Sequence, residues 1–371
     1  MCNRILALYS TIFLAIILDR VLVLNWKPNF RCGIGYEEIF SPNNPRKFIP
    51  QPFIYQGNLP KSEYFSNYTS TRCQINLDQS HDFSHFQFIK NEFLLEKIHE
   101  NCDVIDITSN MNYLKMVLDT KLAKKKSISE KFPYPHYELG KTTFRTNTYF
   151  EDKAKRFVLK SFAKKPWVSI HARSIHTKLE EFEKVMQLVN TMITDGVVSY
   201  VFLATDAYDL NQLAYKNIIN KSKLVTIKKE FDKTNYYGHE TYSTRDHEGM
   251  QDAVLEWTII GYADYCISTS FYHSTFSKTS IGKSECKFID YSELPDNRYP
   301  KNFGVIQKSV DLIANGNDDN LNELPDINNK EAYKIWESIP KRKTFHARQC
   351  YPKGTKLDNV ANYWELGTNN I

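Results

Sequence analysis

Short apolar runs alternate with amphipathic segments along the second half of the chain. Apolar residues recur every three or four positions over 179–193 and over 250–260, which is the spacing of one buried helix face. Brief apolar runs at 167–171, 200–204 and 265–268 have the length of buried strands. Strands that alternate with helices predict βαβ units and a parallel sheet. Weaker signals add a helix over 208–219 and strands over 224–227 and 287–289.

The first half begins with an apolar segment over 5–18, followed by the charged pair Asp19-Arg20 and a second apolar run over 21–25. A membrane-spanning helix needs roughly 17–25 apolar residues, so we interpret the first segment as a buried helix, followed by a tight turn and a strand. Residues 27–80 have no clear period, which is typical of long functional loops. Further on, the pattern predicts helices over 83–94 and 111–118, a strand at 102–107, and a helix followed by irregular structure after 330.

The apolar pattern thus divides into two α/β regions, and 371 residues is a usual length for two domains. A basic, proline-containing break at 164–166 places the boundary near residue 160. We predict a first α/β domain over 1–160, a second Rossmann-like domain over 161–315 and a C-terminal extension over 316–371. The two domains are expected to face each other across a cleft.

Composition and charge narrow the range of partners. Hydrophobic residues make up 42% of the chain and charged residues 25%, as in a globular protein with a core. The formal net charge of +5 is small and scattered, which argues against nucleic acid and suits a small anionic ligand. The seven cysteines include no C-x-x-C pair, so zinc is not expected.

The positions of the cysteines bear on the compartment of the protein. Three lie in apolar runs and are interpreted as buried thiols: Cys102, Cys266 and Cys286. Three others lie in polar loops and are candidates for disulfides if the protein is secretory: Cys32, Cys73 and Cys350. Glycosylation sequons at Asn67 and Asn220 agree with a lumenal location, although such triplets also occur by chance.

Polar or charged side chains follow three of the predicted strands. They are Arg173, the pair Thr205-Asp206, and the triplet Ser274-Thr275-Phe276. Ligands of open α/β sheets bind at the carboxyl ends of the strands, so we expect these residues to share one site. A guanidinium binds two phosphate oxygens at once, and the N–H groups of a helix start also bind phosphate. The ordinary alternatives are a surface salt bridge for Arg173 and helix capping for Asp206 and Ser274.

Several patterns in the chain occur in a fixed order. They are Asn3-Arg4 before the first apolar segment, H-x-R at 171–173, F-L-A-T-D at 202–206, and T-S followed by S-T-F between 269 and 276. This order resembles the GDP-fucose-dependent fucosyltransferases, and among them most the plant-type xyloglucan α-1,2-fucosyltransferases. The resemblance covers most of residues 2–290 but is tight only in these patches.

The chain departs from the family pattern in two places. The wider signature is H-x-R-R-x-D, whereas here Ser174 replaces the second arginine and His176 stands in the place of the aspartate. Met1 and Cys2 occupy positions where the family has glycines of a loop. The resemblance therefore leads us to expect a chain that begins inside the first domain.

The resemblance implies a GT-B-like fold and the inverting, metal-independent transfer of fucose from GDP-fucose to a glycan hydroxyl, with galactose and an α-1,2 linkage expected. It implies these roles: Arg173 binds the β-phosphate, His171 shapes the same loop, Thr205 and Asp206 contact the nucleotide, Ser274, Thr275 and Phe276 line the diphosphate and nucleoside, and Asn3 and Arg4 face the cleft. Asp206, His171 and His176 are the candidates for a general base.

The expected partners are a nucleotide sugar and a glycan acceptor. The chain contains no D-x-D triplet of the kind that holds a diphosphate through a divalent ion, so no metal and no cofactor are expected. The family is expected in the Golgi lumen as a type II membrane protein, here with the anchor outside the chain. Acceptor contacts are expected in loops 27–80 and 228–246, where Tyr236, Tyr237 and Tyr242 can stack on sugar rings or simply pack locally.

Three alternatives stay open. A GT-B transferase for another nucleotide sugar would be stabilised by a nucleotide other than GDP. A catalytically inactive nucleotide- or sugar-binding relative would bind GDP without turnover, and the loss of the second arginine favours it. A structural protein tethered to a membrane is disfavoured by the parallel-sheet pattern.

Overall fold

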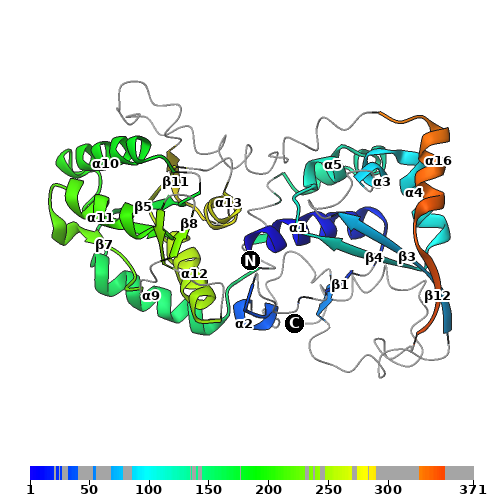
Figure 1. The fold of residues 1–371 in the computed structure, drawn as a ribbon, viewed down its shortest axis with the longest axis horizontal. Helices are drawn as coiled ribbons and strands as arrows, with labels where there is room; N and C mark the ends of the chain where they lie inside the picture. The colour runs from blue at the N-terminus through cyan, green and yellow to red at the C-terminus, as the bar shows by residue number, and fades with distance from the viewer. Residues whose placement is uncertain are drawn as a thin grey trace. The chain divides into compact units, whose positions relative to one another are not determined.

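The computed structural model describes residues 1–20, 22–24, 26, 32–40, 53–55, 68–77, 86–133, 135, 139–140, 144–175, 177–229, 234–236, 239–242, 247–269, 274–282, 284–289 and 326–346. The chain forms two compact units (Figure 1). Unit 1 comprises Met1–Asn25, Pro45–Pro135 and Asn315–Ile371, and unit 2 comprises Trp26–Asn44 and His136–Ala314. The segment 136–160, which sequence reasoning places in the first domain, thus groups with the second Rossmann-like region.

Unit 2 is built on a five-stranded sheet with the order β11-β10-β5-β6-β7, in which every neighbouring pair is parallel. The strands are β5 (Trp167–Ala172), β6 (Tyr200–Thr205), β7 (Leu224–Val225), β10 (Tyr265–Ser268) and β11 (Lys287–Ile289). The parallel sheet and its central strands are therefore as the apolar pattern predicts. Because β10, β5 and β6 are adjacent and parallel, their carboxyl ends meet at one edge.

Helices cover both faces of this sheet. They are α9 (Thr148–Phe162), α10 (Leu179–Thr194), α11 (Tyr208–Asn217), α12 (His247–Ile260) and α13 (Thr275–Gly282). Val168 and Ile170 pack into one core cluster with residues of α10 and α11. On the opposite face of β5, Trp167 stacks on Phe162 of α9, with ring centroids 4.2 Å apart. Burial on both faces explains why β5 reads as a continuous apolar run, and each buried aliphatic side chain contributes about 1.5–3 kcal/mol.

Unit 2 also contains shorter elements. They are α2 (Tyr36–Ile39), the 3₁₀ helix η2 (Lys221–Lys223), and a hairpin of β8 (Thr234–Tyr236) and β9 (His239–Thr241). The hairpin lies in a stretch for which the sequence predicts only a loop. Phe40, directly after α2, packs on Trp257 of α12 with ring centroids 6.1 Å apart, so the aromatic content of 26–44 serves in part to attach this segment to unit 2.

Unit 1 contains a three-stranded sheet of β3 (Tyr68–Leu77), β4 (Val104–Ser109) and β12 (Lys341–His346), with β12 antiparallel to β3. A separate parallel pair joins β1 (Leu22–Leu24) to β2 (Phe53–Tyr55). Its helices are α1 (Cys2–Ile17), α3 (Gln87–Lys90), α4 (Glu92–Asn101), α5 (Leu114–Asp119), α6 (Lys121–Lys125), α7 (Ile128–Lys131) and α16 (Asn329–Ser338). In β3, Cys73, Ile75 and Leu77 are buried and alternate with polar residues.

The predicted first helix is confirmed as α1, and it ends in the predicted turn, where Asp19 adopts a left-handed conformation with φ of 49°. None of the helices within the described ranges has the length and apolarity to cross a membrane. The single helix predicted over 83–94 is instead two helices. They are separated at Asn91, whose side-chain oxygen accepts a hydrogen bond from the Leu94 N–H (3.3 Å) and so begins α4.

The cysteine interpretation needs correction. Disulfides join Cys73 to Cys102 and Cys266 to Cys286. The prediction of buried thiols was therefore wrong for three positions: Cys102, Cys266 and Cys286. Each bond joins neighbouring strands or their immediate flanks, and such a pairing depends on strand order. The buried Cys32 keeps its thiol, which donates to the Ile34 carbonyl (3.9 Å), and Cys350 lies outside the described residues.

Candidate functional site

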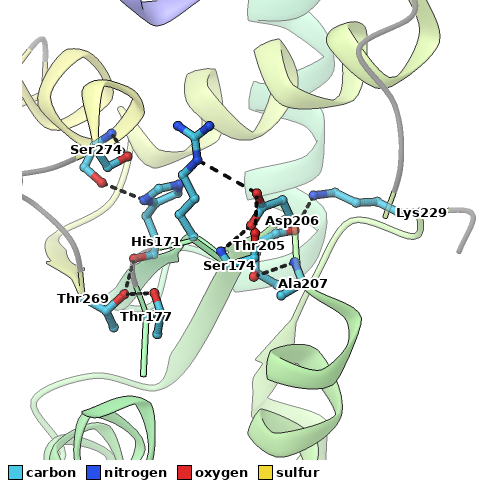
Figure 2. A network of polar contacts seen from close by, with 11 residues as sticks. His171, Ser174, Thr177, Thr205, Asp206, Ala207, Lys229, Thr269 and Ser274 are labelled. Atoms are coloured by element: carbon cyan, nitrogen blue, oxygen red, sulfur yellow. Dashed lines mark hydrogen bonds and ion pairs between the residues drawn. The ribbon is translucent and has the colours of Figure 1, made fainter. Parts of the chain in front are cut away.

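The polar residues that follow β5 and β6 lie together at the carboxyl ends of these strands (Figure 2). Ser174 donates twice to the Asp206 carboxylate, from its backbone N–H to Oδ1 (2.7 Å) and from its hydroxyl to Oδ2 (3.1 Å). Asp206 therefore fixes the turn that leaves β5. This turn carries Arg173, so the carboxylate determines where the guanidinium can reach.

Arg173 places a guanidinium at this edge. Its Nε lies 4.0 Å from Asp206 Oδ2, and the two side chains are 31% and 43% exposed. An ion pair at that separation and exposure is worth at most about 1 kcal/mol. The pair can therefore open at little cost when a stronger anion is present. A guanidinium with this exposure is suited to bind a phosphate through two parallel N–H bonds.

His171 connects the end of β5 to the beginning of α13. Its buried ring stacks on Phe276 at a centroid distance of 4.7 Å and an interplanar angle of 18°. Its Nδ1 is hydrogen-bonded to Ser277 Oγ (2.6 Å), and Ser277 Oγ contacts Ser268 Oγ of β10 (2.7 Å). The imidazole thus holds α13 against two strand ends. This geometry favours a positioning role for His171.

Ser274 begins α13 as a capping residue. It is fully buried, its carbonyl accepts from the Lys278 N–H (3.1 Å), and its hydroxyl faces the Ser277 N–H (3.4 Å). The capping alternative therefore describes Ser274. Thr275 and Phe276 form the first turn of α13 and are half-buried. The first turn of a helix presents N–H groups and a positive end to an anion.

Two hydrogen bonds, one between hydroxyls and one between backbone groups, join the segments that leave β5 and β10. Thr177 and Thr269 are hydrogen-bonded through their Oγ1 atoms (2.7 Å), and the Thr269 N–H donates to the His171 carbonyl (3.2 Å) (Figure 2). At the end of β6, Thr205 Oγ1 accepts from the Ala207 N–H (3.1 Å), so this hydroxyl serves the local turn. The structure therefore places a guanidinium, an imidazole and a helix start at one sheet edge.

A buried ion pair behind this edge escaped sequence reasoning. Lys229 Nζ donates to Glu256 Oε1 (2.7 Å) and to the carbonyl of Thr205 (2.8 Å), the residue before Asp206. The ammonium also lies 5.6 Å from the centroid of the Tyr242 ring. The pair connects α12 to β6. The one sequence signal for it is a glutamate within the almost wholly apolar run of α12.

Glu256 is buried to 5% exposure, and this burial raises its pKa from 4.5 to about 7. The charge and hydrogen bond of Lys229 oppose the shift, while Asp252 and Asp206 reinforce it. Burial also raises the pKa of Asp252, against the nearby lysines Lys229 and Lys153. The pKa of the Glu256 carboxyl group behind this edge is therefore close to neutral pH.

Several predicted residues lie elsewhere or are not described. Asn3 and Arg4 are in the first turn of α1, in unit 1, and their role stays a prediction. His176 and Tyr237 lie outside the described residues. Tyr242 packs locally, since its hydroxyl accepts from Asn211 Nδ2 (2.7 Å). In the part of the chain that the structure describes, no group of three or more His, Cys, Asp or Glu side chains is arranged to hold a metal ion.

No protein-family model and no curated protein sequence matches the chain. Among solved structures it is similar to FUT1 of Arabidopsis thaliana, a plant fucosyltransferase determined as a variant in complex with GDP, with a TM-score of 0.52, 13% identity, and coverage of 81% of this chain and 70% of that one. The fold is that of a GT-B-like glycosyltransferase. The fucosyltransferase POFUT1 in complex with GDP-fucose is also similar, with a TM-score of 0.42, 15% identity, and coverage of 77% and 91%.

The predicted α/β class is thereby confirmed: this chain has the Rossmann-like GT-B architecture with parallel sheets. At 13% identity the similarity to FUT1 shows the fold alone.

Proposed function

We propose that the chain transfers fucose from GDP-fucose to a hydroxyl of a glycan acceptor. The observation that carries the proposal is Arg173, placed by the Ser174–Asp206 contacts at the carboxyl ends of the parallel strands in unit 2. The fold supports it, because the similar structure of FUT1 is a fucosyltransferase in complex with GDP. The order of the sequence patterns supports the donor sugar.

The chemistry follows from where negative charge develops. An acceptor oxygen forms a bond to the anomeric carbon while the bond from that carbon to the β-phosphate oxygen breaks, so the electron pair leaves with GDP. A fixed guanidinium and the N–H groups of the first turn of α13 stabilise this charge more in the transition state than in the ground state. Both Asp206 oxygens accept from Ser174 and His171 Nδ1 is bonded to Ser277, which supports positioning roles for these two residues.

The finer features are proposed with the function. They are inversion at the anomeric carbon, independence of metal, galactose as the acceptor with an α-1,2 linkage, and nucleotide contacts by Thr205 and Thr275. Residence in the Golgi lumen is proposed as well. It agrees with the two disulfides, since such bonds persist in oxidising compartments.

The decisive experiment is Arg173→Ala, measured as release of GDP from GDP-fucose in the presence of galactose-terminated glycans, with the product identified by mass. We expect turnover to fall by about 10²–10³-fold, the usual loss for one transition-state donor. Arg173→Lys should retain only part of the wild-type turnover, because an ammonium lacks the planar fork of a guanidinium. The matched control is Arg156→Ala, which removes an exposed arginine of α9. Equal losses in the two alanine variants would contradict the proposal.

A second candidate is a nucleotide- or sugar-binding protein without turnover. The observation in its favour is Ser174, a buried serine in the place of the family's second arginine. Thermal unfolding with GDP, UDP and GDP-fucose distinguishes the two, because a ligand stabilises the state that binds it. Stabilisation by GDP together with absence of product on every glycan would select this candidate.

A further inference from the structure

The connection between α11 and β7 carries the triplet Asn220-Lys221-Ser222. It has the form Asn-x-Ser in which the middle residue is not proline, the acceptor pattern for N-linked glycosylation. All three residues are exposed in the folded unit. None of the three residues belongs to the proposed nucleotide site.

The side-chain nitrogen of Asn220, Nδ2, is the atom to which a sugar would be attached, and it points away from the hydrogen bonds that the side chain makes. Asn220 Oδ1 accepts from the Ser222 N–H (3.0 Å) and from the Ser222 hydroxyl (2.7 Å), and so caps the 3₁₀ helix η2. A backbone N–H requires an acceptor, so the oxygen of the carboxamide faces Ser222 and the nitrogen faces away. A sugar on Nδ2 therefore leaves both hydrogen bonds in place, and the folded chain accommodates the modification without rearrangement.

The surrounding backbone is fixed. The Ile219 N–H donates to Asn190 Oδ1 (3.0 Å), and Asn190 Nδ2 donates to the Asn217 carbonyl (2.8 Å). Ile219 is 64% exposed, the highest value among the large hydrophobic residues in the described ranges. The residue next to the triplet is thus an apolar side chain that the fold holds in solvent. A carbohydrate attached at Asn220 would screen it.

The two disulfides indicate the compartment in which the protein folds. Cys73–Cys102 and Cys266–Cys286 place one cross-link in each unit. Disulfides form and persist in secretory compartments and are rare in the reducing cytosol. N-linked glycans are attached in that same secretory route. From the exposed, capped triplet and the two disulfides together, we propose that Asn220 carries an N-linked glycan in the native protein.

The transfer step balances with a co-reactant from the host cell, a lipid-linked oligosaccharide diphosphate used by its oligosaccharide-transferring enzyme. Nδ2 of Asn220 forms a bond to the anomeric carbon of the oligosaccharide. The bond from that carbon to the diphosphate oxygen breaks, and the lipid diphosphate leaves with the electron pair. The Nδ2 proton passes to a base of the transferring enzyme.

The test begins with the protein purified from its natural source. Peptide N-glycosidase should convert Asn220 to aspartate, which peptide mapping detects at this position independently of the second sequon at Asn67. An Asn220 that is unmodified before treatment and unchanged after it would overturn the proposal. This readout does not involve GDP-fucose, so its failure and failure of the proposed function are distinguishable.

Matched variants of the full chain, directed into the secretory route of a eukaryotic host by an added signal peptide, test the requirement for the triplet. Asn220→Gln and Ser222→Ala should each lose one glycosidase-sensitive step in electrophoretic mobility, whereas Ser222→Thr keeps it because its hydroxyl remains. Asn67→Gln serves as the control for the other sequon. If Asn220→Gln kept every glycosidase-sensitive mobility step of the wild type, the assignment would also be overturned.

Discussion

Lys229→Met is expected to make the stability of unit 2 depend on pH above neutrality. In the wild type, Lys229 lies 2.7 Å from the buried carboxylate of Glu256. Methionine has a similar length without the charge, so the variant leaves this carboxyl group buried without its cation. An uncompensated buried carboxylate is costly, and the group avoids that cost by taking up a proton. The proton uptake is what the experiment measures.

The magnitude follows from linkage between proton binding and folding. Glu256 has a pKa of about 7 in the folded protein and 4.5 ordinarily, so the wild type loses the corresponding stability as pH rises from about 4.5 to about 7. Lys229 holds the pKa of Glu256 down by its charge and hydrogen bond, and without it the pKa lies higher. Above pH 7 the free energy of unfolding of the variant therefore continues to fall by about 1.4 kcal/mol per pH unit, whereas that of the wild type levels off. Between about pH 7 and pH 8.5 the difference in stability between wild type and variant thus grows by about 2 kcal/mol.

The assay is urea unfolding followed by tryptophan fluorescence, with the disulfides intact, at steps from about pH 5.5 to about pH 8.5. Trp167 and Trp257 are both buried in unit 2 and report on it. The control is Lys229→Met combined with Glu256→Gln. Its neutral amide does not titrate, so the difference in stability from the wild type should no longer grow above pH 7. Parallel stability profiles for wild type and Lys229→Met would refute the coupling between these two residues.

Two further predictions concern the turn after β5 and unit 1. Ser174→Ala removes the hydroxyl bond to Asp206 and keeps the backbone bond, so we expect a loss of about 1 kcal/mol in urea unfolding and weaker stabilisation by GDP; a wild-type unfolding midpoint and wild-type stabilisation by GDP would contradict this anchor. Replacing Cys73 and Cys102 together by alanine should destabilise unit 1 by about 2–4 kcal/mol under non-reducing conditions. Unfolding identical to that of the wild type would argue against this pairing.

The sheet of unit 2 could be predicted because its strands are buried on both faces. Such strands are continuous apolar runs, and the polar residue that ends each run marks the carboxyl end. Arg173 and Asp206 were found by this rule, and parallel pairing of β5 with β6 then brings them to one edge. The rule needs no knowledge of contacts between distant residues.

The features that sequence reasoning missed depend on such contacts. β3 and β12 are rich in polar residues, so their composition does not indicate strands. They are strands because their backbones are hydrogen-bonded to each other. The pair of Lys229 and Glu256 joins a loop to a helix, and neither residue type indicates burial by itself. The disulfides likewise follow from which strands are neighbours. Local pattern therefore predicts elements and strand ends, whereas the electrostatics behind the edge require the fold.

Ser174 explains how the edge can work with one arginine fewer than the family signature. An arginine at this position would have to leave the buried site that Ser174 occupies. The backbone N–H bond to Asp206 would remain, but the bond from the hydroxyl to the second carboxylate oxygen would be lost. With serine, Asp206 is held by a neutral donor, so its charge remains available to balance Arg173 when no anion is bound. A bound diphosphate then competes with a single carboxylate at 4.0 Å, and the guanidinium can turn to it without leaving an unpaired charge buried. The departure from the signature therefore removes a cation and keeps the arrangement that the proposed transfer requires.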